Sequence, residues 1–149
     1  MSNRVEPSAT HQAREDSRPL RVLLVEDHPD VAAAMGEFLK SEGLEVQTAA
    51  SGREALEAAT AFKPQLVLCD LYLPDMNGLD VVRDLRLNSV TAGSCMAILS
   101  AASGAEVARQ QGADQQRVDA VISKPISLDA LHRLVEATRR RMAPETNNP

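Results

Sequence analysis

Short apolar runs alternate along this chain with longer stretches in which apolar residues recur every three or four positions. The apolar runs predict five strands, over residues 20–26, 44–49, 65–69, 95–99 and 119–123. Such runs, separated by helical patterns, are typical of parallel strands in βαβ units. The pattern therefore predicts an α/β fold with a doubly wound, mostly parallel sheet of five strands.

Five helices are predicted between and after these strands. The first begins at Pro29, which suits a first helical turn, and Gly43 ends it. The others are expected over residues 51–62, 79–87, 105–111 and 127–141. The apolar spacing predicts inward-facing side chains at Val31, Ala34, Met35, Phe38 and Leu39 of the first helix, and at Leu79, Val82, Leu85 and Leu87 of the third.

One domain over residues 20–141 accounts for all of these elements. Residues 1–19 and 142–149 are polar and lack a regular apolar period, so we expect a flexible tail at each end. Met1 and the two tails favour a complete small protein. The alternative that the chain was cut from a longer protein stays open.

Composition narrows the class of protein. The formal net charge of −5 and the scarcity of aromatic residues, 2% of the chain, argue against nucleic acid as a partner. We expect no membrane partner, because no apolar run is long enough to span a bilayer and residues 1–19 lack a signal peptide's apolar segment. Cys69 and Cys95 lie in predicted core strands, and reduced, buried thiols there favour a cytoplasmic protein.

Polar residues end four of the predicted strands. Glu26 and Asp27 follow the first strand, Asp70 the third, Ser100 the fourth and Lys124 the fifth. Ligands bind beyond the carboxyl ends of parallel strands, where these residues should converge. Three carboxylates repel one another and therefore call for a divalent cation. The lysine and the hydroxyl then call for an anion such as a phosphoryl group.

Each of these residues also has a simpler interpretation. Strand ends are often polar, an aspartate can start a turn, and a single lysine is usually a solvated surface charge. Ser100 could cap a loop. The coincidence of all of them at one sheet edge favours a site.

The motifs VLLVEDH, LVLCDLYLPDMNGL, AILSA and ISKPIS occur in this order. Together they resemble the receiver domain of bacterial response regulators, which has a flavodoxin-like fold. The resemblance extends over about residues 20–140, and its strength lies in the combination of the motifs.

The resemblance implies that Asp70 accepts a phosphoryl group from a histidine of a sensor histidine kinase or a histidine phosphotransfer protein. It implies one Mg²⁺ held by Glu26, Asp27, Asp70 and the backbone carbonyl of Tyr72. Lys124 and Ser100 would each bind a phosphoryl oxygen. Pro125 follows Lys124, where the family usually has a cis peptide bond.

Three positions bear on how the switch would compare with the rest of the family. Val121 stands where the family often carries an aromatic switch residue, so we expect activation to run through Ser100 and its loop. Tyr72 and Ala102 occupy positions that tend to tune dephosphorylation in the family. Because Tyr72 is bulky, we expect it to shield the phosphoryl group from water and to slow its hydrolysis.

The function expected from the sequence is a phosphorylation switch in a two-component pathway, which is not an enzyme beyond its own phosphorylation and dephosphorylation. Its output would be a contact with another protein on the surface formed by the fourth helix, fifth strand and fifth helix. A phosphorelay intermediate, a phosphate sink or the receiver part of a larger hybrid kinase fits the same residues. A phosphatase with an aspartate nucleophile is disfavoured, since Tyr72 stands where such enzymes carry a second aspartate. A receiver that only binds proteins is disfavoured because Asp70, Ser100 and Lys124 are all present.

Overall fold

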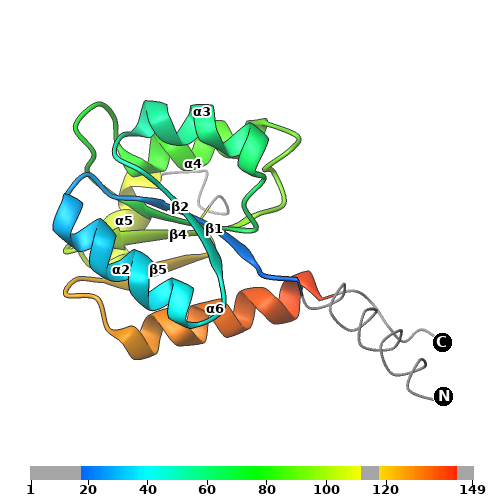
Figure 1. The fold of residues 1–149 in the computed structure, drawn as a ribbon. Coiled ribbons are helices and arrows are strands. Elements are labelled where there is room, and N and C mark those ends of the chain that lie inside the picture. Colours follow the sequence, from blue (N-terminus) through cyan, green and yellow to red (C-terminus); the bar gives the residue numbers. More distant parts are fainter. Residues whose placement is uncertain (1–17, 112–117, 144–149) are drawn as a thin grey trace, which may run out of the picture.

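Five parallel strands form a single sheet in the computed structural model, which describes residues 18–111 and 118–143. The sheet has the order β2-β1-β3-β4-β5 (Figure 1). The strands are β1 (Arg21–Val25), β2 (Glu45–Ala49), β3 (Leu66–Asp70), β4 (Cys95–Ser100) and β5 (Ala120–Ser123). The predicted α/β fold with a doubly wound sheet is confirmed, because the chain starts in the middle of the sheet and builds outward in both directions.

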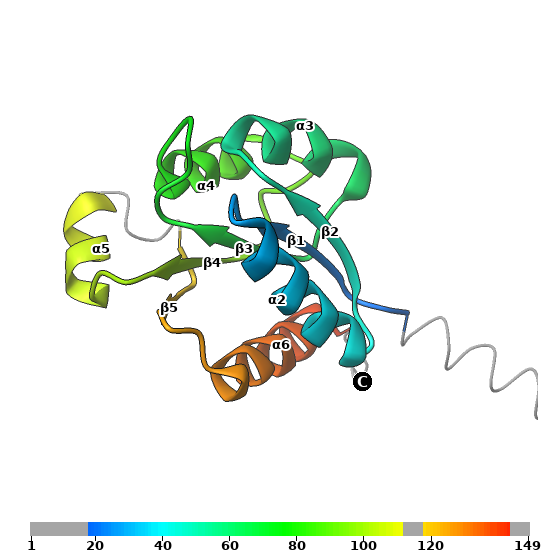
Figure 2. The same ribbon diagram turned by 60° about the vertical axis from the view of Figure 1, so that its left-hand side comes forward.

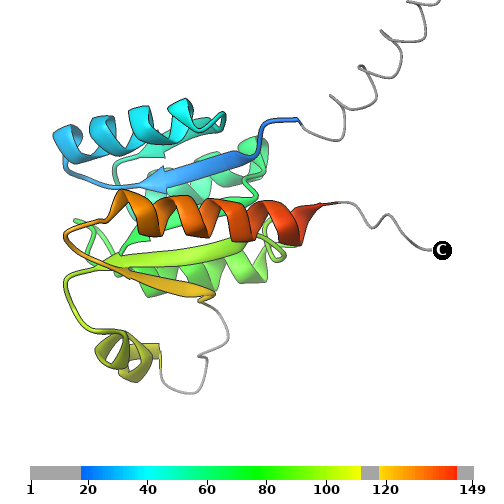
Figure 3. The same ribbon diagram turned by 90° about the horizontal axis from the view of Figure 1, so that it is seen from below.

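Helices cover both faces of this sheet. They are α2 (Pro29–Ser41), α3 (Gly52–Phe62), α4 (Gly78–Leu87), α5 (Gly104–Gln111) and α6 (Leu128–Met142). Helices α2 and α6 lie side by side on one face (Figures 1 and 3). Helices α3 and α4 cover the other face, and α5 lies beyond them beside β4 and β5 (Figure 2). None of the helices described combines the length and apolar character that a membrane span requires.

The central strands are buried on both faces, which explains their unbroken apolar runs. Along β3, Leu66 and Leu68 pack in the cluster under α2 and α6. Val67 and Cys69 pack in the cluster under α3, α4 and α5. Both cysteines are free and buried, as predicted. At the edge of the sheet, β2 keeps polar side chains in solvent, and its run is accordingly less apolar.

Side-chain caps fix where several helices begin. The hydroxyl of Ser51 accepts a hydrogen bond from the backbone N–H of Glu54, and the Glu54 carboxylate accepts one from the N–H of Ala50. The two bonds differ from a capping box in one respect, because the Glu54 carboxylate accepts from the residue before the N-cap and not from the N-cap itself. Ser127 caps α6 in the same way, by accepting from the N–H of Ala130. After α2, Gly43 has a φ of +85°, which explains a glycine at the point where that helix has ended.

Three apolar side chains for which the periodicity predicts an inward orientation are exposed to solvent. Leu87 is 73% exposed, although an inward orientation was predicted. It is the last residue of α4 and follows buried Leu85 by two positions, so it lies on nearly the opposite side of the helix. Val31 and Ala34 of α2 are also exposed rather than buried, as is Leu128 in the first turn of α6. The predicted tails fall almost entirely outside the described residues.

Candidate functional site

The polar residues that end the strands all lie at one edge of the sheet. Glu26 and Asp27 come directly after β1, Asp70 ends β3, and Ser100 ends β4. Lys124 follows β5, and its backbone N–H donates to the carbonyl of Ser100. The structure therefore brings together the five residues that the sequence singled out. They converge because the strands are parallel and in register.

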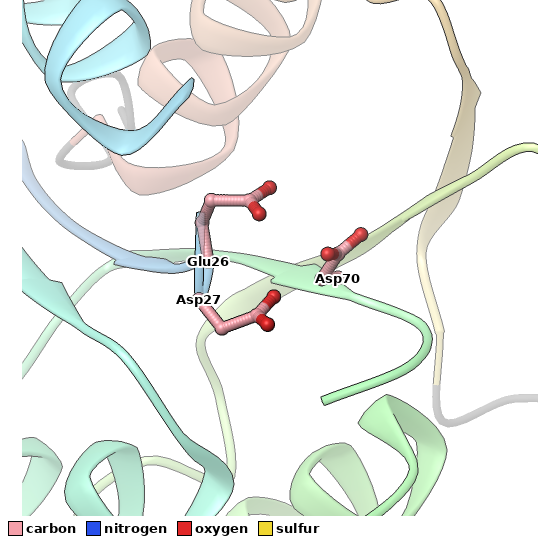
Figure 4. A group of neighbouring side chains, drawn as sticks. All are labelled: Glu26, Asp27 and Asp70. Carbon is pink, nitrogen blue, oxygen red and sulfur yellow. The ribbon is translucent and has the colours of Figure 1, made fainter. Parts of the chain in front are cut away.

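Three carboxylates form the centre of this edge. One oxygen from each of Glu26, Asp27 and Asp70 lies within 4.8 Å of the other two. Figure 4 shows the Glu26 and Asp27 side chains leaving the end of β1 toward the space in front of Asp70. Glu26 and Asp70 are buried, whereas Asp27 is exposed. The cluster is thus open to solvent on one side.

Glu26 is the least satisfied member of the cluster. Its Oε2 accepts a hydrogen bond of 3.1 Å from the backbone N–H of His28. Its Oε1 is buried and has no hydrogen-bond partner among the described residues. Burial raises the pKa of the Glu26 carboxyl, and the nearby charge of Asp70 raises it further. A buried carboxylate oxygen with free lone pairs is a suitable ligand for a hard divalent cation, so these residues fit a metal site.

Lys124 supplies the positive charge of the site. Its Nζ lies 2.6 Å from Oδ1 of Asp70 and 3.9 Å from Oε1 of Glu26. The peptide bond to Pro125 is cis, as expected. With all groups ionised, one ammonium faces three carboxylates, so two negative charges remain uncompensated. This excess favours a divalent cation near the carboxylates.

Ser100 is buried beside this cluster with its hydroxyl turned toward its own loop. The Oγ atom accepts a hydrogen bond of 2.8 Å from the backbone N–H of Ala102. No hydrogen bond joins it to Asp70 in the described part of the chain. Val121 of β5 is half-buried in the same core cluster as Ala102.

The loop that follows Asp70 is folded tightly against the strand end. The N–H of Gly78 donates to the carbonyl of Leu71 over 2.6 Å. A Cβ atom on Gly78 would lie 2.2 Å from the backbone oxygen of Asp70, closer than real contacts allow. Within the loop, Tyr72 and Asn77 form an isolated antiparallel bridge. A glycine at position 78 is therefore required for the backbone to return beside the acidic cluster.

Two side chains that sequence reasoning missed hold this loop from outside. The Asp75 carboxylate accepts hydrogen bonds of 2.9 Å from the N–H groups of Gly52 and Arg53, at the start of α3. These bonds lower the pKa of Asp75. On the other side, Gln110 of α5 donates to the Tyr72 hydroxyl over 3.1 Å. The sequence shows LPDMNG as a turn but carries no sign of these partners, which lie more than 20 residues away along the chain.

A groove of about 500 Å³ adjoins the acidic cluster on the side of α2 and β2. Glu26 and Asp27 are among its lining residues, together with small residues of α2 such as Ala33 and Gly36. The acidic cluster is therefore reachable from the surface between this helix and the edge strand.

Comparison with known proteins assigns the family. Residues 22–136 match the response regulator receiver domain. The probable transcriptional regulatory protein TcrX of Mycobacterium tuberculosis is 34% identical over 131 residues, which cover 86% of this chain and 53% of that protein. The cell cycle transcriptional regulator CtrA of Caulobacter vibrioides is 34% identical over 122 residues, which cover 82% of this chain and 51% of CtrA. The chain thus spans about half the length of these curated relatives.

Solved structures agree with this assignment. The chemotaxis response regulator CheY4 of Vibrio cholerae superimposes with a TM-score of 0.73 at 25% identity, over 80% of this chain and 98% of that one. The signal receiver domain of a LuxO repressor protein from Vibrio parahaemolyticus gives 0.70 at 31% identity, over 83% and 92% of the two chains. The matched family, the shared fold and the acidic edge of the sheet together show that the chain belongs to the response regulator receiver domains of two-component signal transduction.

Proposed function

We propose that this chain accepts a phosphoryl group on Asp70 from a phosphohistidine of a sensor histidine kinase or a histidine phosphotransfer protein. The observation that carries the proposal is the position of the Asp70 carboxylate. It ends β3 beside two further carboxylates, with the Lys124 ammonium 2.6 Å away. The family's role in two-component signalling supports the same assignment.

The chemistry is a transfer between two nucleophiles. A carboxylate oxygen of Asp70 attacks phosphorus, and the bond from phosphorus to the donor's imidazole nitrogen breaks. The electron pair of that bond stays with the imidazole nitrogen, which takes a proton from solvent. The product on Asp70 is an acyl phosphate, a mixed anhydride that stores the signal.

Repulsion between Asp70 and an incoming phosphoryl anion opposes this transfer. We assign a Mg²⁺ ion to Glu26, Asp27, Asp70 and the backbone carbonyl of Tyr72. The unpartnered Oε1 of Glu26 and the excess negative charge support this assignment. When bound, the ion would neutralise the charge that gathers between carboxylate and phosphoryl group. Oxygen ligands of this kind, few in number and open to water, suit Mg²⁺.

Lys124 and Ser100 would each bind an oxygen of the phosphoryl group once it is attached to Asp70. Lys124 would exchange its contact with Asp70 for a phosphoryl oxygen, since its Nζ already lies at the acceptor. Ser100 would turn from the Ala102 N–H toward another phosphoryl oxygen. The loop between β4 and α5 would then lose one of its hydrogen bonds and rearrange, which converts a local charge change into a new surface.

The output is a contact with another protein on the surface formed by α5, β5 and α6. A half-buried valine at position 121 supports a readout through the Ser100 loop, because no aromatic side chain at that position can rotate. In this proposal the chain catalyses only its own phosphorylation and dephosphorylation, and the exchange takes place in the cytoplasm.

The experiment that tests this function is intact-mass spectrometry after incubation with Mg²⁺ and acetyl phosphate. We expect a single phosphoryl adduct that disappears without Mg²⁺ and in Asp70→Asn. Glu45→Gln, an exposed carboxylate change on β2, is the matched control and should be modified like the wild type. An adduct that survives in Asp70→Asn would place the modification elsewhere and overturn the proposal.

A further inference from the structure

The side chain of Gln110 links helix α5 to the loop that follows the acceptor. We infer that Gln110 is a positioning residue that holds the Tyr72 ring at the rim of the site and so prolongs the life of the phosphoryl group on Asp70. This inference rests on the proposed phosphorylation of Asp70. The inference means that a residue of α5, outside the acidic edge of the sheet, affects how long Asp70 stays phosphorylated.

A continuous chain of hydrogen bonds carries the inference. The backbone N–H of Leu79, at the start of α4, donates to Oδ1 of Asn77 over 2.7 Å. Nδ2 of Asn77 donates to Oε1 of Gln110 over 3.3 Å, and Nε2 of Gln110 donates to the Tyr72 hydroxyl over 3.1 Å. Because a backbone N–H can only donate, it fixes the orientation of the Asn77 amide, which in turn fixes that of Gln110.

Gln110 is also held from its own helix. Its Nε2 lies 3.4 Å from Oε2 of Glu106, one turn earlier in α5. Glu106 in turn forms an ion pair with Arg109. These contacts restrict the rotamers of Gln110 before it reaches the loop, so less side-chain entropy is lost when it binds Tyr72.

The position of Tyr72 explains why holding it matters. Asp70 and Tyr72 are separated by Leu71, which is 1% exposed and points into the core. Tyr72 follows the acceptor by two residues, and the chain bends between them at Leu71. The ring is 64% exposed, and its hydroxyl is fixed to α5 by Gln110. The Tyr72 ring thus stands two residues beyond the acceptor, with its hydroxyl end held by α5.

Hydrolysis of an acyl phosphate needs water in line with the bond that breaks. A ring fixed at the rim reduces the space from which water can approach, whereas a ring free to rotate exposes that space for part of the time. Losing one exposed hydrogen bond corresponds to a change of about fivefold in the fraction of time the ring is held. We therefore expect Gln110→Ala to shorten the phosphoryl lifetime by about this factor.

A double-mutant cycle on the full chain tests the inference. Wild type, Gln110→Ala, Tyr72→Phe and the double variant are phosphorylated with Mg²⁺ and acetyl phosphate, the donor is removed, and loss of the adduct is followed by intact mass. Each single change should speed the loss by about fivefold, and the double variant should decay no faster than either. Gln47→Ala, an exposed glutamine on β2, serves as the control and should decay like the wild type.

The outcomes separate this inference from the function on which it rests. Absence of any adduct on wild-type Asp70 would overturn the proposed function. An adduct whose lifetime is unchanged by Gln110→Ala would overturn the inference alone. So would a double variant whose acceleration is the product of the two single effects, because Gln110 would then act independently of Tyr72. A Gln110→Ala variant whose melting temperature falls while its phosphoryl lifetime is unchanged would show a merely structural role.

Discussion

At the scale of the residue, Glu26 is the side chain of the site that most destabilises the folded protein. A buried carboxylate with one unpartnered oxygen destabilises the folded chain unless a cation is present. His28 satisfies one of its oxygens and Lys124 stands too far from the other for a hydrogen bond. The chain therefore keeps an unfavourable group at the position where the proposed metal would bind.

Replacing this carboxylate should separate stability from metal binding. We expect Glu26→Gln to raise the free energy of unfolding of the metal-free protein at pH 7 by about 1 kcal/mol, because a neutral amide is easier to bury than a charge. The same change should weaken Mg²⁺ binding by about tenfold or more. Urea denaturation and isothermal titration with Mg²⁺ measure the two effects. Glu45→Gln is the control, and a variant that loses stability in the metal-free state would contradict the account.

The sequence revealed which residues form the site better than it revealed which side chains contact one another. Asp70 and Lys124 were found because strand ends of a parallel sheet meet at a common edge. The partners of Asp75 and Gln110 were missed, since each reaches an element that is fixed only by tertiary packing. Turn motifs indicate that a loop bends, but they do not indicate which neighbouring helix its side chains contact.

At the scale of the element, the loop between β3 and α4 depends on a single glycine. Its return to the strand end leaves no room for a side chain at position 78, where a Cβ would meet the Asp70 backbone oxygen at 2.2 Å. By contrast, nothing lies within 4 Å of a Cβ placed on Gly36 in the middle of α2. Replacing these two glycines with alanine should therefore change the stability of the fold in opposite directions.

We expect Gly78→Ala to destabilise the fold by about 2–3 kcal/mol, because backbone atoms must move to accept the methyl group. Gly36→Ala should stabilise it by about 0.5–1 kcal/mol, since alanine is the better helix former and has space there. Equilibrium denaturation of both variants measures the difference. Equal changes in the two variants would show that the close approach at position 78 is relieved at little cost.

Helix boundaries followed from caps where the capping side chain is local. Ser51 and Ser127 each accept a hydrogen bond from a backbone N–H three residues further along the chain, at the positions where the sequence predicts that these helices begin. Inward orientation was less well predicted at the end of a helix, as Leu87 shows. A helical period continues up to the last residue of a pattern, whereas the core it packs against ends earlier.

At the scale of the whole molecule, the fold was predictable because the apolar runs of its strands show directly that these segments are buried. Strands covered on both faces must be apolar throughout, and such runs are visible without any partner information. The parallel direction of the strands followed from their alternation with helices, whereas that pattern alone does not give the order β2-β1-β3-β4-β5. The contacts between α6 and the end of α2 were not predictable, because the residues that form them are 90 or more positions apart.

One of these contacts is an ion pair between His132 and Glu42 whose strength depends on pH. His132 of α6 places Nδ1 2.6 Å from Oε1 of Glu42, the residue that caps α2, and Arg139 donates to the carbonyl of Glu42. The hydrogen bond and the charge of Glu42 raise the pKa of His132 above its usual value of 6.5. A raised folded-state pKa gives a stabilisation that is complete below the unfolded value and is lost as pH rises through the folded one.

We therefore expect the melting temperature to fall as pH rises from about 6 to about 8, and to fall less in His132→Gln and in Glu42→Gln. Thermal denaturation monitored by circular dichroism across this range measures the difference. Because the pair is exposed to solvent, added salt should reduce the wild-type slope. His28→Gln, which changes an exposed histidine at the opposite end of α2, should keep that slope. If His132→Gln retained the full wild-type slope, the contact between α2 and α6 would not be the group that titrates.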